Sequence, residues 1–228
     1  MSYILHIETA TDICSVAISK MDKLISIQEE KNSLKHSEII TLQIEEVIKS
    51  AGIDKNVLSA VSLSEGPGSY TSLRVGMSAA KAICFALNIP LIGINTLESL
   101  FTATVKKDMG NLLYCPMIDA RRMEVYASLF VNETISIFEN KPVILDENTF
   151  DIYIKDENRI VFSGNGSIKA KEKYKSSKFI FTDTLCSAKN LIKPAYKKYK
   201  IGDFADLTYF SPNYIKPPNI TKPKVKQL

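Results

Sequence analysis

Two short stretches carry residues that suit nucleotide binding. In the first, IETATD, an apolar run ends in Glu8, and the hydroxyls of Thr9 and Thr11 follow. An acid at a strand end can hold a hydrated divalent cation, while hydroxyls and amides of the turn face phosphate oxygens. The second stretch, DARRM, places Asp119 similarly but lacks glycine, so side chains occupy the turn where backbone would have to approach a phosphate. The paired site therefore looks incomplete.

A third stretch, EGPGSYTS, leaves two interpretations open. In one, free amides around Gly66, Gly68 and Ser69 bind an anion at the start of the following helix. No Lys follows Gly68 at the place that a P-loop requires. In the other, the stretch is a strand-to-helix corner that glycine permits, Pro67 stiffens and a hydroxyl caps. We favour the corner.

Metal and nucleophile chemistry has little support. His6 and His36 are the two histidines of the chain; they stand thirty positions apart, and no HxxxH or HExxH occurs. His6 alternates into an apolar strand and is expected in the core, while His36 is expected to begin a helix. The sequence predicts no metal site.

Hydrophobic periodicity gives the elements that position these groups. Alternating apolar residues predict strands over 3–8, 14–20, 24–30 and 57–64, and longer periodic segments predict helices over 36–51 and 71–87. Asn95, with Glu98 three residues later, resembles a capping box that opens a further helix. Near the other end, Pro194 is expected to shorten or kink a closing helix.

The second half restarts like the first. ILHIETATDICSVAI and YCPMIDARRMEVYASLF each give an apolar strand ending in a carboxylate, a short turn and an alternating strand. We interpret this as a weak internal duplication, with chance similarity of two hairpins as the alternative. It predicts an α/β protein with an N-terminal lobe over 1–107, a C-terminal lobe over 108–210 and an extended basic tail over 211–228.

Two helices carry more apolar surface than one sheet can cover. In the helix over 36–51, Ile40, Ile44, Val47 and Ile48 form the face expected on the sheet, and a second stripe contains Ile39, Leu42, Gln43 and Glu46. The helix over 71–87 is apolar nearly all round, interrupted by Arg74, Ser78 and Lys81 with Phe85 beside them. It is either fully buried or sandwiched between its own sheet and another subunit.

Composition is that of an ordinary folded protein, with 228 residues, 45% hydrophobic and 24% charged. Neither a signal peptide nor an apolar run long enough to span a membrane is apparent, and the four cysteines form no CxxC pair. We therefore expect a cytoplasmic protein with reduced thiols. Its net charge of +4 is uneven, because residues 189–228 hold nine Lys against two Asp, or +7. Such an end either attracts RNA or is simply solvated.

Four stretches resemble, in the same order, the motifs of the TsaB (YeaZ) family of bacterial tRNA-modification proteins. They are ILHIETATDICSVAIS, GPGSYTSLRVGMSAAKAICFALNIPLIGINTLESL, IDARRMEVYASLF and PNYIK. The resemblance implies an ASKHA fold of two ribonuclease-H-like lobes. It also implies a role in attaching the threonylcarbamoyl group to N6 of adenosine 37 in ANN-decoding tRNAs (t6A). The alternative from another class is an ATP-dependent kinase-like enzyme of the same fold.

The family also implies partners and roles for residues. Its members are non-catalytic: they pair with the homologous subunit TsaD, the ATPase TsaE joins them, and tRNA is bound through the complex. ATP or ADP and metal are expected on those partners and none is required here; alone, the protein is expected to form a homodimer. Family pairing through the first two helices points to Ile39, Leu42, Gln43, Glu46, Arg74, Ser78, Lys81 and Phe85 as interface.

Departures from the family pattern fall at the turns. The family commonly has Asp where Glu8 stands, Gly at Ser72 and Met123, and Arg at Lys216. These changes argue against nucleotide binding by this subunit alone. We therefore expect vestigial nucleotide loops at Glu8, Thr9, Thr11, Gly66, Gly68 and Ser69.

Overall fold

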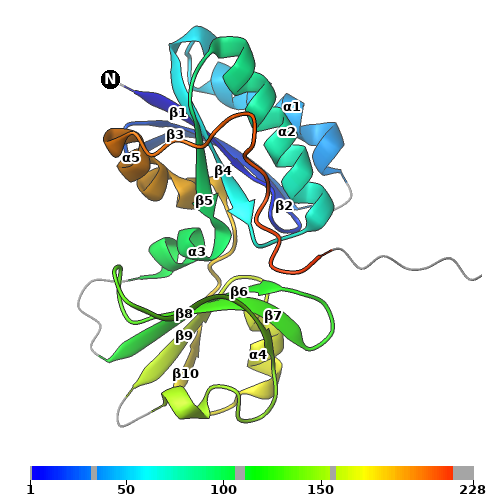
Figure 1. Ribbon diagram of the computed structural model, residues 1–228, viewed down its shortest axis with the longest axis vertical. Coiled ribbons are helices and arrows are strands. Elements are labelled where there is room, and N and C mark those ends of the chain that lie inside the picture. The colour runs from blue at the N-terminus through cyan, green and yellow to red at the C-terminus, as the bar shows by residue number, and fades with distance from the viewer. Residues whose placement is uncertain (1, 32–34, 106–110, 155–157, 218–228) are drawn as a thin grey trace, which may run out of the picture.

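The chain folds into two lobes, each built on a five-stranded sheet (Figure 1). The computed structural model describes residues 2–31, 35–105, 111–154 and 158–217. The first sheet has the order β3-β2-β1-β4-β5. Its strands are β1 (Tyr3–Glu8), β2 (Ile13–Lys20), β3 (Lys23–Lys31), β4 (Leu58–Gly66) and β5 (Leu91–Asn95).

The second sheet has the order β10-β9-β6-β7-β8. Its strands are β6 (Leu112–Asp119), β7 (Glu124–Phe130), β8 (Ser136–Ile144), β9 (Arg159–Ser163) and β10 (Phe179–Phe181). In the first sheet, β1 pairs antiparallel with β2 and parallel with β4; in the second sheet, β6 pairs antiparallel with β7 and parallel with β9. This common topology confirms the internal duplication and the expected α/β fold of two ribonuclease-H-like lobes.

Helices cover both faces of the first sheet. On one face, α1 (His36–Ser50) and α2 (Tyr70–Leu87) pack with Leu5 and Ile7 of β1. On the other face, α5 (Ile192–Ile201) packs with Ile4 and its neighbours. Successive side chains of a strand point to opposite faces, so a strand buried on both sides must be apolar throughout, as YILHI nearly is.

The second lobe has its own core, which contains a cluster of aromatic rings. Phe150 is fully buried, with its ring centroid 5.1 Å from that of Phe162 and 5.7 Å from that of Tyr174. The helix α4 (Ser167–Lys173) contributes Ala170 to this core, and Tyr153 of the short 3₁₀ helix η2 (Asp151–Tyr153) packs against it. Between the lobes, α3 (Thr96–Thr104) contributes Phe101, which stacks on Phe130 at 4.4 Å.

The last part of the chain returns to the first lobe. After the second sheet, the 3₁₀ helix η3 (Ala188–Leu191) leads into α5, and Leu191 and Ala195 pack against the first sheet. The expected C-terminal lobe over 108–210 therefore differs from the structure, because its last twenty or so residues belong to the first hydrophobic core. Pro194 lies in the first turn of α5, where a missing N–H costs no helical hydrogen bond, so it does not kink the helix.

Residues 204–217 form an extended segment that we call the C-terminal strap. It begins beside β5, where the amide of Ala205 donates to the carbonyl of Leu91 at 2.9 Å. It then runs along α2 toward the second lobe (Figure 1). The amide of Asn213 donates to the carbonyl of Glu65 at 2.7 Å, and Lys216 forms an ion pair with Glu124 of β7. The strap thus links the two lobes. Of the expected tail over 211–228, residues 211–217 belong to this strap, and residues 218–228 lie outside the described residues.

Candidate functional site

The turn after β1 is filled by its own carboxylate. Oε1 of Glu8 accepts hydrogen bonds from the amide of Ala10 and the hydroxyl of Ser64, each at 2.7 Å. The side chain is fully buried, and burial raises its pKa to about 7 against the lowering effect of these hydrogen bonds. Oε2 has no hydrogen-bond partner among the described residues. The amide of Ala10, which a phosphate would need as a donor, is therefore already bound to this carboxylate.

The EGPGSYTS loop packs directly on this turn. The amide of Ser69 donates to the carbonyl of Ala10 at 2.7 Å, and a Cβ on Gly68 would lie 2.5 Å from that same oxygen. A Cβ on Gly76 of α2 would lie 2.3 Å from Oγ1 of Thr9. Thr9 and Thr11 are buried, at 1% and 6% exposure. A phosphate has no room between the loop and the turn.

The loop itself is a covered corner. Gly66 has φ +117°, a conformation that favours glycine, and a Cβ there would lie 2.6 Å from the carbonyl oxygen of Asn213 in the C-terminal strap. At the helix start, Ser69 makes no capping bond with its side chain, and its hydroxyl accepts from that of Ser72 at 2.9 Å. This geometry is that of the packed corner which the sequence favoured over an anion site.

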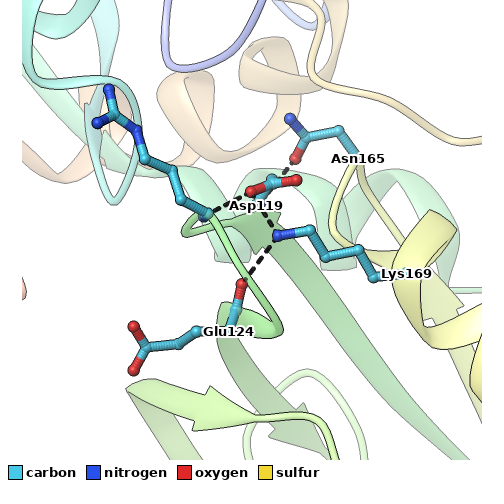
Figure 2. A network of polar contacts seen from close by, with 5 residues as sticks. Asp119, Glu124, Asn165 and Lys169 are labelled. Carbon is cyan, nitrogen blue, oxygen red and sulfur yellow. Dashed lines mark hydrogen bonds and ion pairs between the residues drawn. The ribbon is translucent and has the colours of Figure 1, made fainter.

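A lysine neutralises the corresponding turn of the second lobe (Figure 2). Oδ1 of Asp119 accepts from Nζ of Lys169 at 2.8 Å and from the amide of Arg121 at 2.6 Å. The same ammonium also donates to the carbonyl of Glu124 at 3.4 Å, and Oδ1 of Asn165 accepts from the amide of Asp119 at 3.0 Å. The lysine from α4 thus holds the positive charge that a bound cation would otherwise bring to this carboxylate.

Two arginines of this turn have a strained backbone. Arg121 and Arg122 have φ of 68° and 49°, a left-handed conformation that L-residues rarely adopt. Both side chains are exposed. The second turn therefore takes a left-handed backbone without any glycine.

The described residues offer no group of three or more His, Cys, Asp or Glu placed to hold a metal ion. The ring of His6 is buried between the hydroxyls of Ser62 and Ser19, at 2.7 and 2.8 Å. Burial lowers its pKa to about 3, so the ring is neutral. This histidine serves the core, as its place in the strand predicted.

The eight expected interface residues separate into three groups. Leu42 and Phe85 are large apolar side chains that are 63% and 82% exposed, and Glu46 and Ser78 are exposed beside them on the same helices. Ile39 is half-buried and packs against the core of the first lobe. These five residues lie on or near the outer surface of α1 and α2, where the interface was expected.

Gln43 lies elsewhere than expected. It is 8% exposed, and its Nε2 donates to the carbonyl of Cys14 in β2 at 3.3 Å. Oε1 of Gln43 is buried without a hydrogen-bond partner among the described residues. Since this side chain turns inward to the sheet, it does not belong to the exposed stripe.

Arg74 and Lys81 contact the C-terminal strap. The guanidinium of Arg74 lies 4.0 Å from the ring centroid of Tyr70, and its Nε donates to the hydroxyl of Tyr214 at 3.0 Å. The rings of Tyr70 and Tyr214 are 4.6 Å apart, and Nζ of Lys81 donates to the carbonyl of Thr208 at 3.3 Å. Sequence reasoning missed these contacts; an aromatic residue in the PNYIK stretch was the available signal.

A pocket of about 590 Å³ with a mixed polar and apolar lining lies apart from these residues. The segment over 183–190 forms one wall, and Ile13, Glu29 and Ala103 contribute from β2, β3 and α3. None of the candidate site residues lines it.

No helix in the described part of the chain is long and apolar enough to cross a membrane.

Comparison with known proteins gives consistent similarities. The family model described as TsaD, tRNA N6-adenosine threonylcarbamoyltransferase, matches residues 19–221. A tRNA threonylcarbamoyladenosine biosynthesis protein TsaB of Buchnera aphidicola is 33% identical over 135 residues, which cover 59% of this chain and 60% of that protein. A tRNA N6-adenosine threonylcarbamoyltransferase of Bacillus subtilis is 38% identical over 109 residues, covering 41% and 32% of the two chains.

The fold has a close structural counterpart. YeaZ from Pseudomonas aeruginosa superposes with a TM-score of 0.77 at 20% identity, covering 94% of this chain and all of that one. The sequence matches are shorter, because they span 52 to 60% of the length of three TsaB relatives. The similarity in fold therefore extends over nearly the whole chain, whereas the similarity in sequence covers about half of each TsaB relative.

Proposed function

Since the chain belongs to the TsaD family and is similar to TsaB proteins, we propose that it is a non-catalytic subunit in t6A biosynthesis. The complex it serves transfers a threonylcarbamoyl group to N6 of adenosine 37 in ANN-decoding tRNAs. The observation that carries the non-catalytic role is the carboxylate of Glu8, which accepts from a turn amide while Gly68 and Ser69 pack over the same turn. A chain that fills its own phosphate turn is suited to supporting a partner's site.

The second turn supports the same role. In a nucleotide-binding lobe, the strand-end carboxylate must be free to meet a cation or its water shell. Here Asp119 already binds Lys169 at 2.8 Å. ATP or ADP and metal are therefore assigned to the partner subunits, and this subunit requires none.

The partner proposed is a TsaD-type chain that docks on α1 and α2. Leu42 and Phe85 are exposed apolar side chains of the kind that anchor protein interfaces. Glu46 and Ser78 provide the polar rim. A TsaE-type ATPase joins the pair, tRNA is bound by the assembly in the cytoplasm, and the same face forms a homodimer when the partner is absent.

Depletion of the protein in its native host tests the pathway. Nucleoside mass spectrometry of bulk tRNA measures t6A with and without re-expression. We expect the modification to fall on depletion and to return on re-expression. An unchanged t6A level in the depleted cells would refute the proposal.

A matched pair of variants tests the docking face. Leu42→Asp places a charge at a side chain that is 63% exposed on α1, and Ile152→Asp places one at a side chain that is 66% exposed on η2 in the other lobe. We expect Leu42→Asp to abolish co-purification with the TsaD homologue of the same organism, while Ile152→Asp retains it. Both should melt within a few degrees of the wild type, since surface changes cost about 0.5 kcal/mol or less. A complex that survives Leu42→Asp contradicts the assigned face.

Calorimetry with Mg-ATP separates this role from a kinase-like one. With the turn amide of Ala10 bound to Glu8, we expect no saturable binding by the isolated chain. Micromolar binding accompanied by turnover would instead favour an ATP-dependent enzyme.

A further inference from the structure

One side of α5 is a row of exposed lysines. Lys193, Lys197 and Lys200 are exposed, and residues three and four apart on a helix share a face. Lys189, four residues earlier in η3, is exposed as well. We call these four residues the lysine face.

The charges of the lysine face are not neutralised within the described chain. The ion pairs among described residues join Lys169 to Asp119, Lys198 to Asp203 and Lys216 to Glu124, and none of these lysines belongs to the face. Lys200 lies 5.2 Å from the ring centroid of Tyr196, a cation–π contact that leaves its charge in place. Like charges at this spacing repel one another on a helix. A row of this kind is therefore suited to an external polyanion.

The helix holds this row rigidly and away from the proposed docking face. Leu191 and Ala195 anchor its apolar side against Ile4 and Ile92 of the first sheet. α1 and α2 cover the opposite face of that sheet (Figure 1). A partner seated on α1 and α2 would leave the lysine face open to solvent.

We infer that the lysine face binds the phosphate backbone of RNA. From Lys193 to Lys200 the helix rises about 10 Å, at about 1.5 Å per residue. A nucleic-acid strand in a duplex presents one phosphate per about 3.4 Å of axis, so the row spans about three phosphates. Lysine contacts of this kind fix position without reading sequence, which suits a subunit that orients a substrate for another chain.

A membrane surface is a poorer match. A helix that lies in a membrane interface must offer a free apolar side. The apolar side of α5 is used in the core, since Ile192 is buried and Ala195 is fully buried. Identifying the RNA as tRNA rests on the proposed function.

Tight binding can be tested with the full chain and total tRNA from the native host. Fluorescence anisotropy of labelled tRNA, measured from about 50 to 200 mM salt, gives the affinity and its salt slope. The test variant is Lys193→Glu/Lys197→Glu/Lys200→Glu. Its matched control, Lys23→Glu/Lys49→Glu/Lys55→Glu, makes the same charge change at exposed positions of the first lobe. Circular dichroism melts verify that both triple variants fold.

We expect the α5 variant to lose at least tenfold in affinity at the lower salt, and its log–log salt slope to be shallower by about two to three units. The control should lose less than threefold. Equal losses in both variants would mean a diffuse effect of net charge and would overturn the inference. Absence of tRNA binding by the wild type would overturn it too.

Failure of this inference is distinguishable from failure of the proposed function. If depletion lowers t6A but the α5 variant binds tRNA as well as the wild type does, the pathway stands and the lysine face is wrong. If the α5 variant loses binding while depletion leaves t6A unchanged, the RNA surface stands and the pathway is wrong.

Discussion

The buried carboxyl of Glu8 dictates how stability depends on pH. Burial raises its pKa in the folded protein from an ordinary 4.5 to about 7. The folded state therefore binds the proton more tightly than the unfolded state does. The free energy of unfolding must then fall as the pH rises from 4.5 to 7, and the contribution is constant outside this window. At about 1.4 kcal/mol per pKa unit, the two units between pH 5 and 7 amount to about 3 kcal/mol.

Glu8→Gln removes this titration while keeping an oxygen for the amide of Ala10 and the hydroxyl of Ser64. Urea unfolding followed by far-UV circular dichroism suits a chain without tryptophan. Relative to the wild type, the variant should gain about 3 kcal/mol in the free energy of unfolding between pH 5 and pH 8. Glu147→Gln, at an exposed position, serves as the control for loss of a carboxylate and should follow the wild type.

His6 contributes in the opposite direction and cancels in this comparison. Its pKa is lowered by burial to about 3, so its contribution is present above 6.5 and is lost as the pH falls below that value. Since both proteins contain it, the difference between them isolates Glu8. Parallel stability curves for the wild type and Glu8→Gln from pH 5 to 8 would refute the assignment of a protonated, buried carboxyl.

Three further changes test the packing described above. Gly76→Ala puts a Cβ 2.3 Å from Oγ1 of Thr9 and should lower the free energy of unfolding by about 1 to 3 kcal/mol in a urea titration. Recovery of stability on adding Thr9→Ala would identify that contact. An unchanged urea midpoint for the single variant would contradict it. Phe150→Ala empties the centre of the second core and should cost about 3 to 5 kcal/mol by the same measurement, so a loss below 1 kcal/mol would mean a loosely packed site. Tyr214→Ala removes the ring stacked on Tyr70 and should speed proteolytic cleavage within the C-terminal strap, whereas unchanged cleavage would show that the ring does not hold it.

Local patterns were sufficient for the elements and for their repetition. Alternation and helical periodicity depend on neighbours in the sequence, and these predicted most strands and helices within a few residues. The cap at Asn95 is an example, since its Oδ1 accepts from the amides of Leu97 and Glu98 as its position indicated. The duplication was equally readable, because each copy repeats the same order of strand, carboxylate and turn.

Contacts between distant segments were not predictable in this way. The return of α5 and the strap to the first lobe depends on pairings such as Ala205 with Leu91, more than a hundred residues apart, which leave no periodic trace. Gln43 sits at the margin between two faces of α1, and helical spacing alone cannot tell which face it joins. The structure decides it, because the carbonyl of Cys14 lies within reach of its amide.

The return of α5 also sets an order for biosynthesis. A chain leaves the ribosome from its N-terminus, and domains commonly fold as they emerge. The strands of the second sheet, from Leu112 to Phe181, are all translated before α5, whose Ala195 closes one face of the first sheet. Until that helix is released, Ile4 and Ile92 remain an uncovered apolar surface on the nascent chain. The lobe that is translated second can thus complete its core first, and the face of the earlier lobe stays accessible to chaperones until α5 has been translated.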